Sequence, residues 1–321
     1  MAAYLREPKP WLKEGRKTKA AYIWSDTAKR IISIAAPISL ASAIFGITEI
    51  VDLAIVPGRL QSIGFSIQEA TRQFGRLAAG AFPLLNLPTL FTAALQMALV
   101  PSISAATALR DGDAVRRRVK KALSLTLALA VPAAIGLHVL ADPIPTLLYG
   151  QPEVAPILRA LTPAVVFLAL QQVTSGILHG LGRFRAPLVN LALAVAVKAL
   201  VTYVLVGNAS VGILGAGVAT SVHFGIAGLL NLWAVTQEVG SVLDRRGLLK
   251  IFVAGGAMAV IAGFGYSRLS VMISWKAATL AAVGMGAVAY GALALILGIV
   301  RTDELAALPL LGGFFGKPPE A

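Results

Sequence analysis

The chain has 321 residues, of which 57% are hydrophobic and 13% are charged, and it contains no cysteine. Soluble domains carry about 45–50% apolar and about 25% charged residues, so this composition excludes an ordinary soluble globular protein. The lack of cysteine excludes disulfides, thiolate metal sites and cysteine nucleophiles. The net charge of +13 comes from basic residues in short segments between long apolar runs, which favours membrane topology over nucleic-acid binding.

Residues 1–30 form a basic segment that precedes the first apolar run. This segment holds eight Lys and Arg residues and has no apolar core of signal-peptide length, so we expect no cleavable signal peptide. The first apolar stretch begins at Ile31 and is long enough to stay in the membrane.

Eight apolar segments follow, each long enough to cross a bilayer. A spanning helix needs about 20 residues, because each residue rises ~1.5 Å across a hydrocarbon core of ~30 Å. Backbone groups in lipid must satisfy one another, so these segments are predicted to be helices. The sequence therefore predicts an all-α polytopic membrane protein with about eight transmembrane helices. They lie near Ile31–Val56, Arg76–Val100, Ala122–Leu140, Ile157–Leu178, Leu188–Val206, Gly212–Val235, Leu249–Tyr266 and Ala277–Val300.

The basic residues between these segments predict the orientation. With the N-terminus inside, 21 of the 28 Lys and Arg residues fall on the inner side and six on the outer side. This split follows the positive-inside rule. We therefore expect a multi-pass protein of the cell membrane with both termini in the cytoplasm.

Three connecting segments differ from plain loops. Residues 57–75 are mildly amphipathic and are predicted to form an outer loop with a short interfacial helix. Residues 141–150 contain two prolines and are predicted to form an outer turn. Residues 236–250 are charged and separate the first six spans from the last two.

Charged side chains inside spans point to a cavity or to a partner, because they are costly in lipid. Glu49 and Asp52 are three residues apart and share one helix face. They are either an interfacial pair, a cation or proton site, or a counter-charge for a lysine in the membrane. Lys198 lies near the middle of its span and either snorkels to the outer face or lines a central cavity.

Other polar residues on the spans either line a water-filled path or join helices. These are Asn86, Gln96, Gln171, Gln172 and Asn190. His138, His179 and His223 lack metal-ligand spacing and are expected to be packing residues. P-loop, HExxH, GxSxG and dinucleotide motifs are absent from the sequence, so we expect no enzyme activity, no metal site and no cofactor.

Prolines interrupt four of the first six spans. Each removes a backbone hydrogen bond and tends to kink its helix. They are either static kinks or hinges that bend during transport. The candidate hinges are Pro37, Pro83, Pro88, Pro132 and Pro163.

Several stretches resemble polysaccharide exporters of the stage V sporulation protein B type, a group that also includes lipid II flippases and MATE drug exporters. The resemblance covers residues 31–240 by sequence, and residues 250–300 by helix count. The stretches that carry it are LVPSIS (99–104), ALSLTLALAVPAAIGLHVLADPIPTLLYG (122–150), SGILHGLGRFRAPLVN (175–190) and VGILGAGVATSV (211–222).

The resemblance implies two six-helix lobes around a central cavity, of which this chain holds the second. Residues 31–237 would be that lobe, 238–300 an additional helix pair, 1–30 an inter-lobe linker and 301–321 a cytoplasmic tail. The other lobe would come from another chain or from a second copy.

The leading hypothesis is therefore a half-length flippase for a lipid-linked anionic glycan or cell-wall precursor. Lys198 would bind its diphosphate, with Asn86, Gln171, Gln172 and Asn190 as further candidate substrate-binding residues. Glu49 and Asp52 would bind the coupling cation or set the local charge. The alternatives are a drug/cation antiporter of the same fold, and a truncated remnant or scaffold that does not transport.

Overall fold

The structure is a computed structural model that describes residues 20–299, and these residues contain no β-strand. The first half of the chain forms α1 (Ala20–Ser62), α2 (Ile67–Gly75), the π-helical turn η4 (Arg76–Ala81), α3 (Phe82–Ala108), α4 (Gly112–Val139) and α5 (Pro143–Tyr149). The second half forms the short 3₁₀ turn η5 (Pro152–Val154), α6 (Ala155–Gly180), α7 (Arg185–Val206), α8 (Leu214–Val239), α9 (Arg245–Met272) and α10 (Trp275–Ile296).

The long helices agree with the predicted spans. Within residues 20–299, seven helices are long and apolar enough to cross a membrane. The remaining predicted span, residues 31–56, lies within α1, which is not one of these seven. The all-α polytopic architecture with about eight spans is therefore confirmed, and the chain is a multi-pass membrane protein.

Capping side chains and left-handed turn residues set many of the helix ends. Asp111 begins α4 by accepting a hydrogen bond of 2.8 Å from the backbone N–H of Ala114. Gly150 ends α5 with a φ of 68°, a conformation that glycine adopts without steric cost. Polar caps and glycines thus divide a largely apolar sequence into separate helices.

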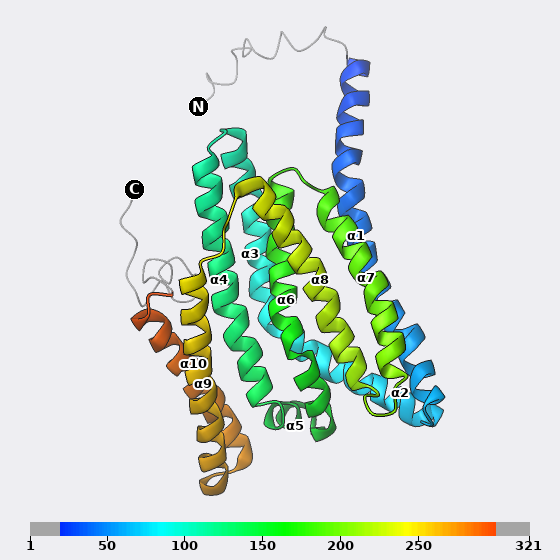
Figure 1. The fold of residues 1–321 in the computed structure, drawn as a ribbon, viewed down its shortest axis with the longest axis vertical. Coiled ribbons are helices and arrows are strands. Elements are labelled where there is room, and N and C mark those ends of the chain that lie inside the picture. Colours follow the sequence, from blue (N-terminus) through cyan, green and yellow to red (C-terminus); the bar gives the residue numbers. More distant parts are fainter. Residues whose placement is uncertain (1–19, 300–321) are drawn as a thin grey trace, which may run out of the picture.

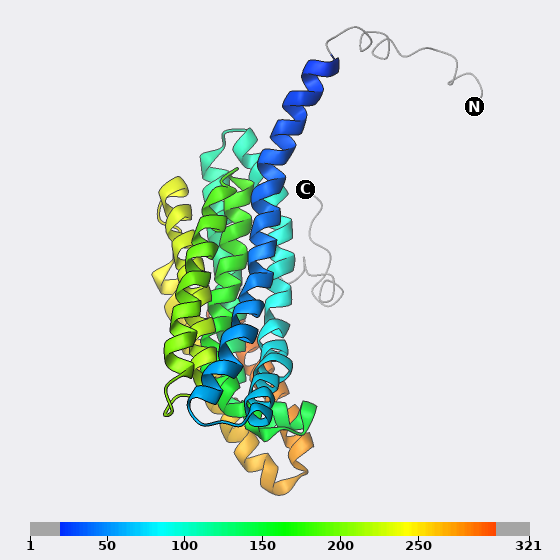
Figure 2. The same cartoon turned by 90° about the vertical axis from the view of Figure 1, so that its right-hand side faces the viewer.

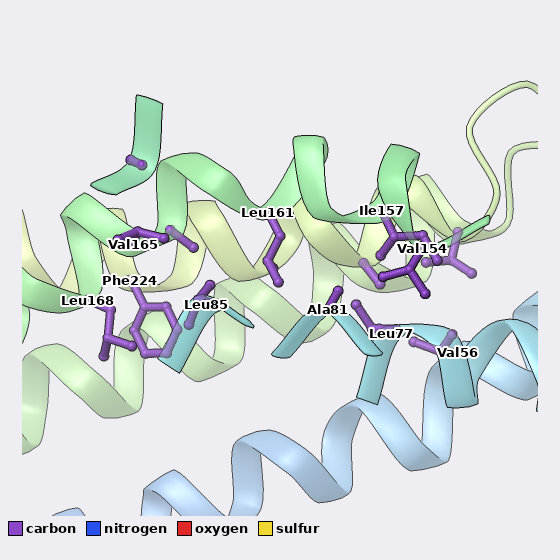
Figure 3. Packing of buried hydrophobic residues seen from close by; sticks show 14 of the residues in the cluster. Val56, Leu77, Ala81, Leu85, Val154, Ile157, Leu161, Val165, Leu168 and Phe224 are labelled. Atoms are coloured by element: carbon purple, nitrogen blue, oxygen red, sulfur yellow. The ribbon is translucent and has the colours of Figure 1, made fainter. Parts of the chain in front are cut away.

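The helices form a bundle with α6 at its centre. α6 packs against α3, α4 and α8, while α8 also packs against α7, and α7 against α1 (Figure 1). Among the seven apolar helices, α6 and α8 are the most deeply buried. The largest buried apolar cluster joins α1, η4, α3, α6 and α8, and includes Val56, Leu77, Leu161 and Phe224 (Figure 3). Its packing fixes the helices that surround the candidate site.

The last two helices form a pair beside α4. α9 packs against both α10 and α4 (Figures 1 and 2). The Tyr290 hydroxyl on α10 donates a hydrogen bond of 2.6 Å to the backbone carbonyl of Ala128 on α4. A Cβ at Gly255 of α9 would lie 2.8 Å from Ile135 Cδ1 on α4, so the two helices pack closely there.

The segment predicted as an outer loop is mostly helical. Residues 57–62 continue α1, and residues 67–75 form α2, so only residues 63–66 connect the two helices. α2 then passes through η4 into α3 without a break. The predicted short helix is present as α2. The predicted loop bounds, 57–75, were wrong because α1 continues to Ser62, beyond the end of its apolar run.

The candidate hinge prolines all lie in helices. Pro83 is the second residue of α3, directly after η4, and Pro88 lies inside the same helix. Pro132 and Pro163 lie inside α4 and α6. α1 runs through position 37, whose side chain lies outside the described residues. Their role as hinges stays a prediction.

Candidate functional site

A cavity of about 600 Å³ lies between α1, α3, α6, α7 and α8. Six of the sequence-predicted site residues line it together. They are Glu49, Asp52, Pro83, Asn86, Gln172 and Lys198. These residues come from four helices and span about 150 positions of the sequence, so the fold brings them together.

The centre of the site is an ion pair between α1 and α7. Lys198 Nζ lies 2.6 Å from Asp52 Oδ2, and both side chains are only 2% exposed. Nζ also donates to the backbone carbonyl of Thr48 at 3.4 Å. Lys198 therefore does not snorkel to the outer face, and Asp52 serves as its counter-charge.

The pair joins two helices that are far apart in the sequence. A buried ion pair adds little net stability, because desolvation offsets the attraction between the charges. Removing one partner is nevertheless costly, because the other charge is left buried and alone.

Only one of the two carboxylate oxygens of Asp52 contacts Lys198. Its second oxygen, Oδ1, is buried and has no hydrogen-bond partner among the described residues. Glu49, three residues earlier on the same helix face, is exposed and lines the same cavity. Two carboxylates therefore share this wall with one ammonium group, and no other ionisable side chain is among the described lining residues.

The opposite wall is uncharged and polar. Asn86 on α3 and Gln172 on α6 line the cavity, and Asn86 is exposed. Gln172 Oε1 accepts a hydrogen bond of 2.5 Å from Thr92 Oγ1, which fixes the amide on α6 to α3. These amides can donate or accept hydrogen bonds, as a sugar or a phosphate would require.

Aromatic residues that the sequence analysis did not single out also line the cavity. Phe74, Phe82 and Phe224 contribute from α2, α3 and α8. Nothing in the sequence distinguishes them from phenylalanines that face lipid. They give the cavity apolar surface next to its charges.

The π-helical turn η4 was also missed. In η4 the backbone N–H of Phe82 bonds to the carbonyl of Leu77, five residues back. Ala78 of this turn lines the cavity directly. π-helical turns are common at functional sites because they re-aim side chains by one position. No local sequence signal marks this one.

Two predicted site residues lie elsewhere, in a polar network that joins α6, α7 and α8. Asn190 Nδ2 donates to Asn231 Oδ1 at 2.8 Å, and Asn231 Nδ2 donates to Ser175 Oγ at 3.0 Å. Gln171 Nε2 also reaches Ser175 Oγ, at 3.3 Å. Gln171 and Asn190 are absent from the cavity lining, so their contacts match the alternative in which polar residues join helices.

His223 lies beside the cavity without lining it. It is fully buried on α8, and its ring lies 4.7 Å from that of Phe224. Neither ring nitrogen makes a hydrogen bond of normal geometry to a described residue. Its surroundings agree with the expected packing role.

Known proteins share this architecture. The family model described as lipid II flippase MurJ matches residues 10–286. A solved structure of lipid II flippase MurJ in an inward closed conformation superposes with a TM-score of 0.52 and 18% identity. The superposition covers 72% of this chain and 53% of the MurJ chain, and it supports the fold.

Curated relatives come from Bacillus subtilis (strain 168). Stage V sporulation protein B is 27% identical over 290 residues, which cover 89% of this chain and 55% of the relative. Lipid II flippase MurJ is 24% identical over 120 residues, which cover 36% of this chain and 22% of the relative. The chain thus spans little more than half the length of the first of these relatives.

These matches confirm the resemblance to exporters of the stage V sporulation protein B type. Since the family model matches most of the sequence, the chain belongs to the lipid II flippase MurJ family.

Proposed function

We propose that this chain forms one half of a flippase that moves a lipid-linked anionic glycan or cell-wall precursor across the membrane by alternating access. The observation that carries the proposal is a cavity of about 600 Å³ whose lining includes a buried lysine and two polar amides. Family membership supports the flippase activity. A polyprenyl-diphosphate sugar offers the phosphates, hydroxyls and apolar chain that such a wall can bind.

The proposed organisation follows the resemblance. Residues 31–237, which contain most of α1, all of α2 to α7 and all but the last two residues of α8, form the transporter lobe, and residues 238–300 form the additional pair. Residues 1–30 and 301–321 lie in the cytoplasm in this proposal. The cavity of this lobe exposes the polar side chains of Glu49 and Asn86, which would be costly to leave against lipid. A second polypeptide or a second copy of this chain would cover them.

In this proposal the Asp52–Lys198 pair takes part in both substrate binding and cation coupling. In the described state Asp52 neutralises Lys198, so a phosphate must compete with this carboxylate for Nζ. A proton or a cation bound at Asp52 and Glu49 would offset the carboxylate charge and release Lys198 to the substrate. Cation entry on one side of the membrane would then favour substrate binding on that side.

The drug/cation antiporter is the second candidate, and one observation favours it. Glu49 and Asp52 outnumber Lys198, so the described ionisable lining has a negative balance when all three are charged. Such a lining attracts a cationic drug more readily than an anionic precursor. In this function the two carboxylates would be essential and Lys198 would be dispensable.

Reconstituted vesicles test the proposal. Vesicles would carry a fluorescent polyprenyl-diphosphate sugar and either this chain alone or this chain with the first half of stage V sporulation protein B. A flipped fluorescent lipid becomes accessible to an impermeant quencher, so the protein-dependent increase in quenching measures flipping. We expect flipping in one of the two preparations, loss of most of it in Lys198→Gln, and none lost in Lys276→Gln, which removes an exposed lysine outside the cavity.

Three outcomes contradict the flippase. The first is no flipping in either preparation, and the second is full activity in Lys198→Gln. The third is cation-driven dye efflux that survives Lys198→Gln but is lost in Glu49→Gln and Asp52→Asn, which would establish the antiporter instead.

A further inference from the structure

A second cavity, of about 540 Å³, lies where α4, α9 and the end of α10 meet. It shares no lining residue with the candidate site. Its lining combines charged, small and apolar side chains from three parts of the chain. The residues that carry the inference are Lys120, Lys121, Ser124, Asp244, Leu248 and Ile251.

The rim of this cavity is basic. Lys120 and Lys121 line it from α4. Arg116, one turn earlier on α4, donates to the carbonyl of Ser241 at 3.3 Å, next to the lining residues 242–244. Lys250 on α9 donates to the carbonyl of Leu297 at 2.8 Å, next to lining residue Gly298. Two lysines therefore line the cavity, and two further cations bond to backbone carbonyls next to its lining residues.

One acid lies among them, and its charge is partly engaged. Asp244 is the N-cap of α9, and its Oδ1 accepts a hydrogen bond of 3.0 Å from the backbone N–H of Arg246. Among the described lining residues two lysines outnumber one acid, and the N-terminus of α9 adds positive potential. The described rim is suited to an anion.

The floor of the cavity is apolar. Leu123 and Ile251 are each 1% exposed, and Leu127 is 9% exposed. Leu248 and Ile299 pack against the buried cluster that contains Leu127 and Ile251. A ligand with an anionic headgroup and an apolar chain would match both the basic rim and the apolar floor of this cavity.

Its position along the helices matches the membrane interface. Lys121 directly precedes the span predicted at residues 122–140, and Leu248 directly precedes the span predicted at 249–266. Both helix ends face the side on which the basic loops gather. Basic pockets between transmembrane helices on this side bind the headgroups of anionic lipids.

We propose that this cavity binds an anionic phospholipid, with its phosphate near Lys120 and Lys121 and its acyl chains over Leu127, Leu248 and Ile251. The lipid would bridge α4 of the lobe to α9 of the terminal pair. This site requires no particular cargo, so it stands whether the chain moves a glycan precursor or a cation. A phospholipid fits better than free phosphate because half of the cavity is hydrocarbon in character.

Native mass spectrometry of the full chain with added phosphatidylglycerol tests this site. We expect Lys120→Gln/Lys121→Gln to weaken binding about thirtyfold, because each lysine near a membrane surface contributes about a fivefold factor. Ser124→Trp should weaken it as well, because the indole fills the cavity and leaves its charges in place. The matched control is Lys29→Gln/Arg185→Gln, which removes two exposed cations outside the cavity and should change binding less than twofold.

Two further arms identify the occupant. Millimolar glycerol 3-phosphate should not displace phosphatidylglycerol if the acyl chains are needed. Asp303→Asn/Glu304→Gln removes the acids that follow residue 299 in the sequence, and it should leave lipid binding unchanged.

The proposal fails if the Lys120/Lys121 and control variants bind the lipid equally. It also fails if glycerol 3-phosphate displaces the lipid, or if Asp303→Asn/Glu304→Gln raises lipid binding several-fold, which would assign the cavity to the C-terminal segment. Unchanged melting temperatures of the variants show that altered binding does not come from unfolding.

Discussion

The guanidinium of Arg59 lies over the ring of Tyr203, 4.1 Å from its centroid, and its Nε donates a hydrogen bond of 3.0 Å to the Tyr203 carbonyl. Arg59 follows Asp52 by two turns of α1, and Tyr203 follows Lys198 on α7. Two polar contacts therefore join the same pair of helices at different depths. α1 and α7 should move as one unit as long as both contacts hold.

The first prediction concerns the deeper contact. Lys198→Met and Asp52→Leu should each lower stability by about 3 kcal/mol or more, because each leaves a buried charged group without its partner. The double variant Asp52→Leu/Lys198→Met should be more stable than either single variant. Thermal unfolding of the purified chain in detergent measures this, and additive losses would show that the two side chains do not interact.

The second prediction concerns the outer contact. A Cβ at Gly207 would overlap the guanidinium of Arg59, so Gly207→Ala should push Arg59 away from Tyr203. The expected loss is about 1 kcal/mol, the size of a partly exposed cation–π contact. In an Arg59→Ala background, Gly207→Ala should cost almost nothing. An equal loss in both backgrounds would contradict the assigned contact.

A third prediction concerns the packing of α3 on α6. A Cβ at Gly180 would lie 2.9 Å from the Ile103 side chain and 3.1 Å from the Val100 carbonyl. Gly180→Val should therefore separate the helices and cost about 1–3 kcal/mol. Gly284→Val is the matched control, since a Cβ there meets nothing within 4 Å. Equal melting temperatures for the two variants would show that α3 and α6 do not pack this closely.

A fourth prediction concerns membrane orientation. Because the chain has no cysteine, single cysteines report on single positions without background labelling. In intact cells, a cysteine at exposed Ser210 should react with an impermeant maleimide, whereas one at exposed Ser241 should react only after permeabilisation. The reverse pattern would invert the proposed orientation, and labelling of both from outside would break the alternation of spans.

Local sequence properties were enough to predict much of this protein. The length and hydropathy of each apolar run predicted a helix, because the bilayer leaves the backbone no other partner than itself. Glu49, Asp52 and Lys198 were recognised for the same reason, since each charge in lipid requires an explanation. The family resemblance also followed from contiguous stretches such as residues 122–150.

Only the tertiary structure decided which polar groups meet. Lys198 contacts Asp52 across 146 positions of sequence, whereas Gln171 and its neighbour Gln172 point into different surroundings. One helical step turns a side chain by about 100°, so adjacent amides take different roles once α3, α7 and α8 pack on α6. The π-helical turn at Arg76–Ala81 likewise has no local signature. Pairing and register depend on how whole helices pack, and no single segment of the sequence encodes that.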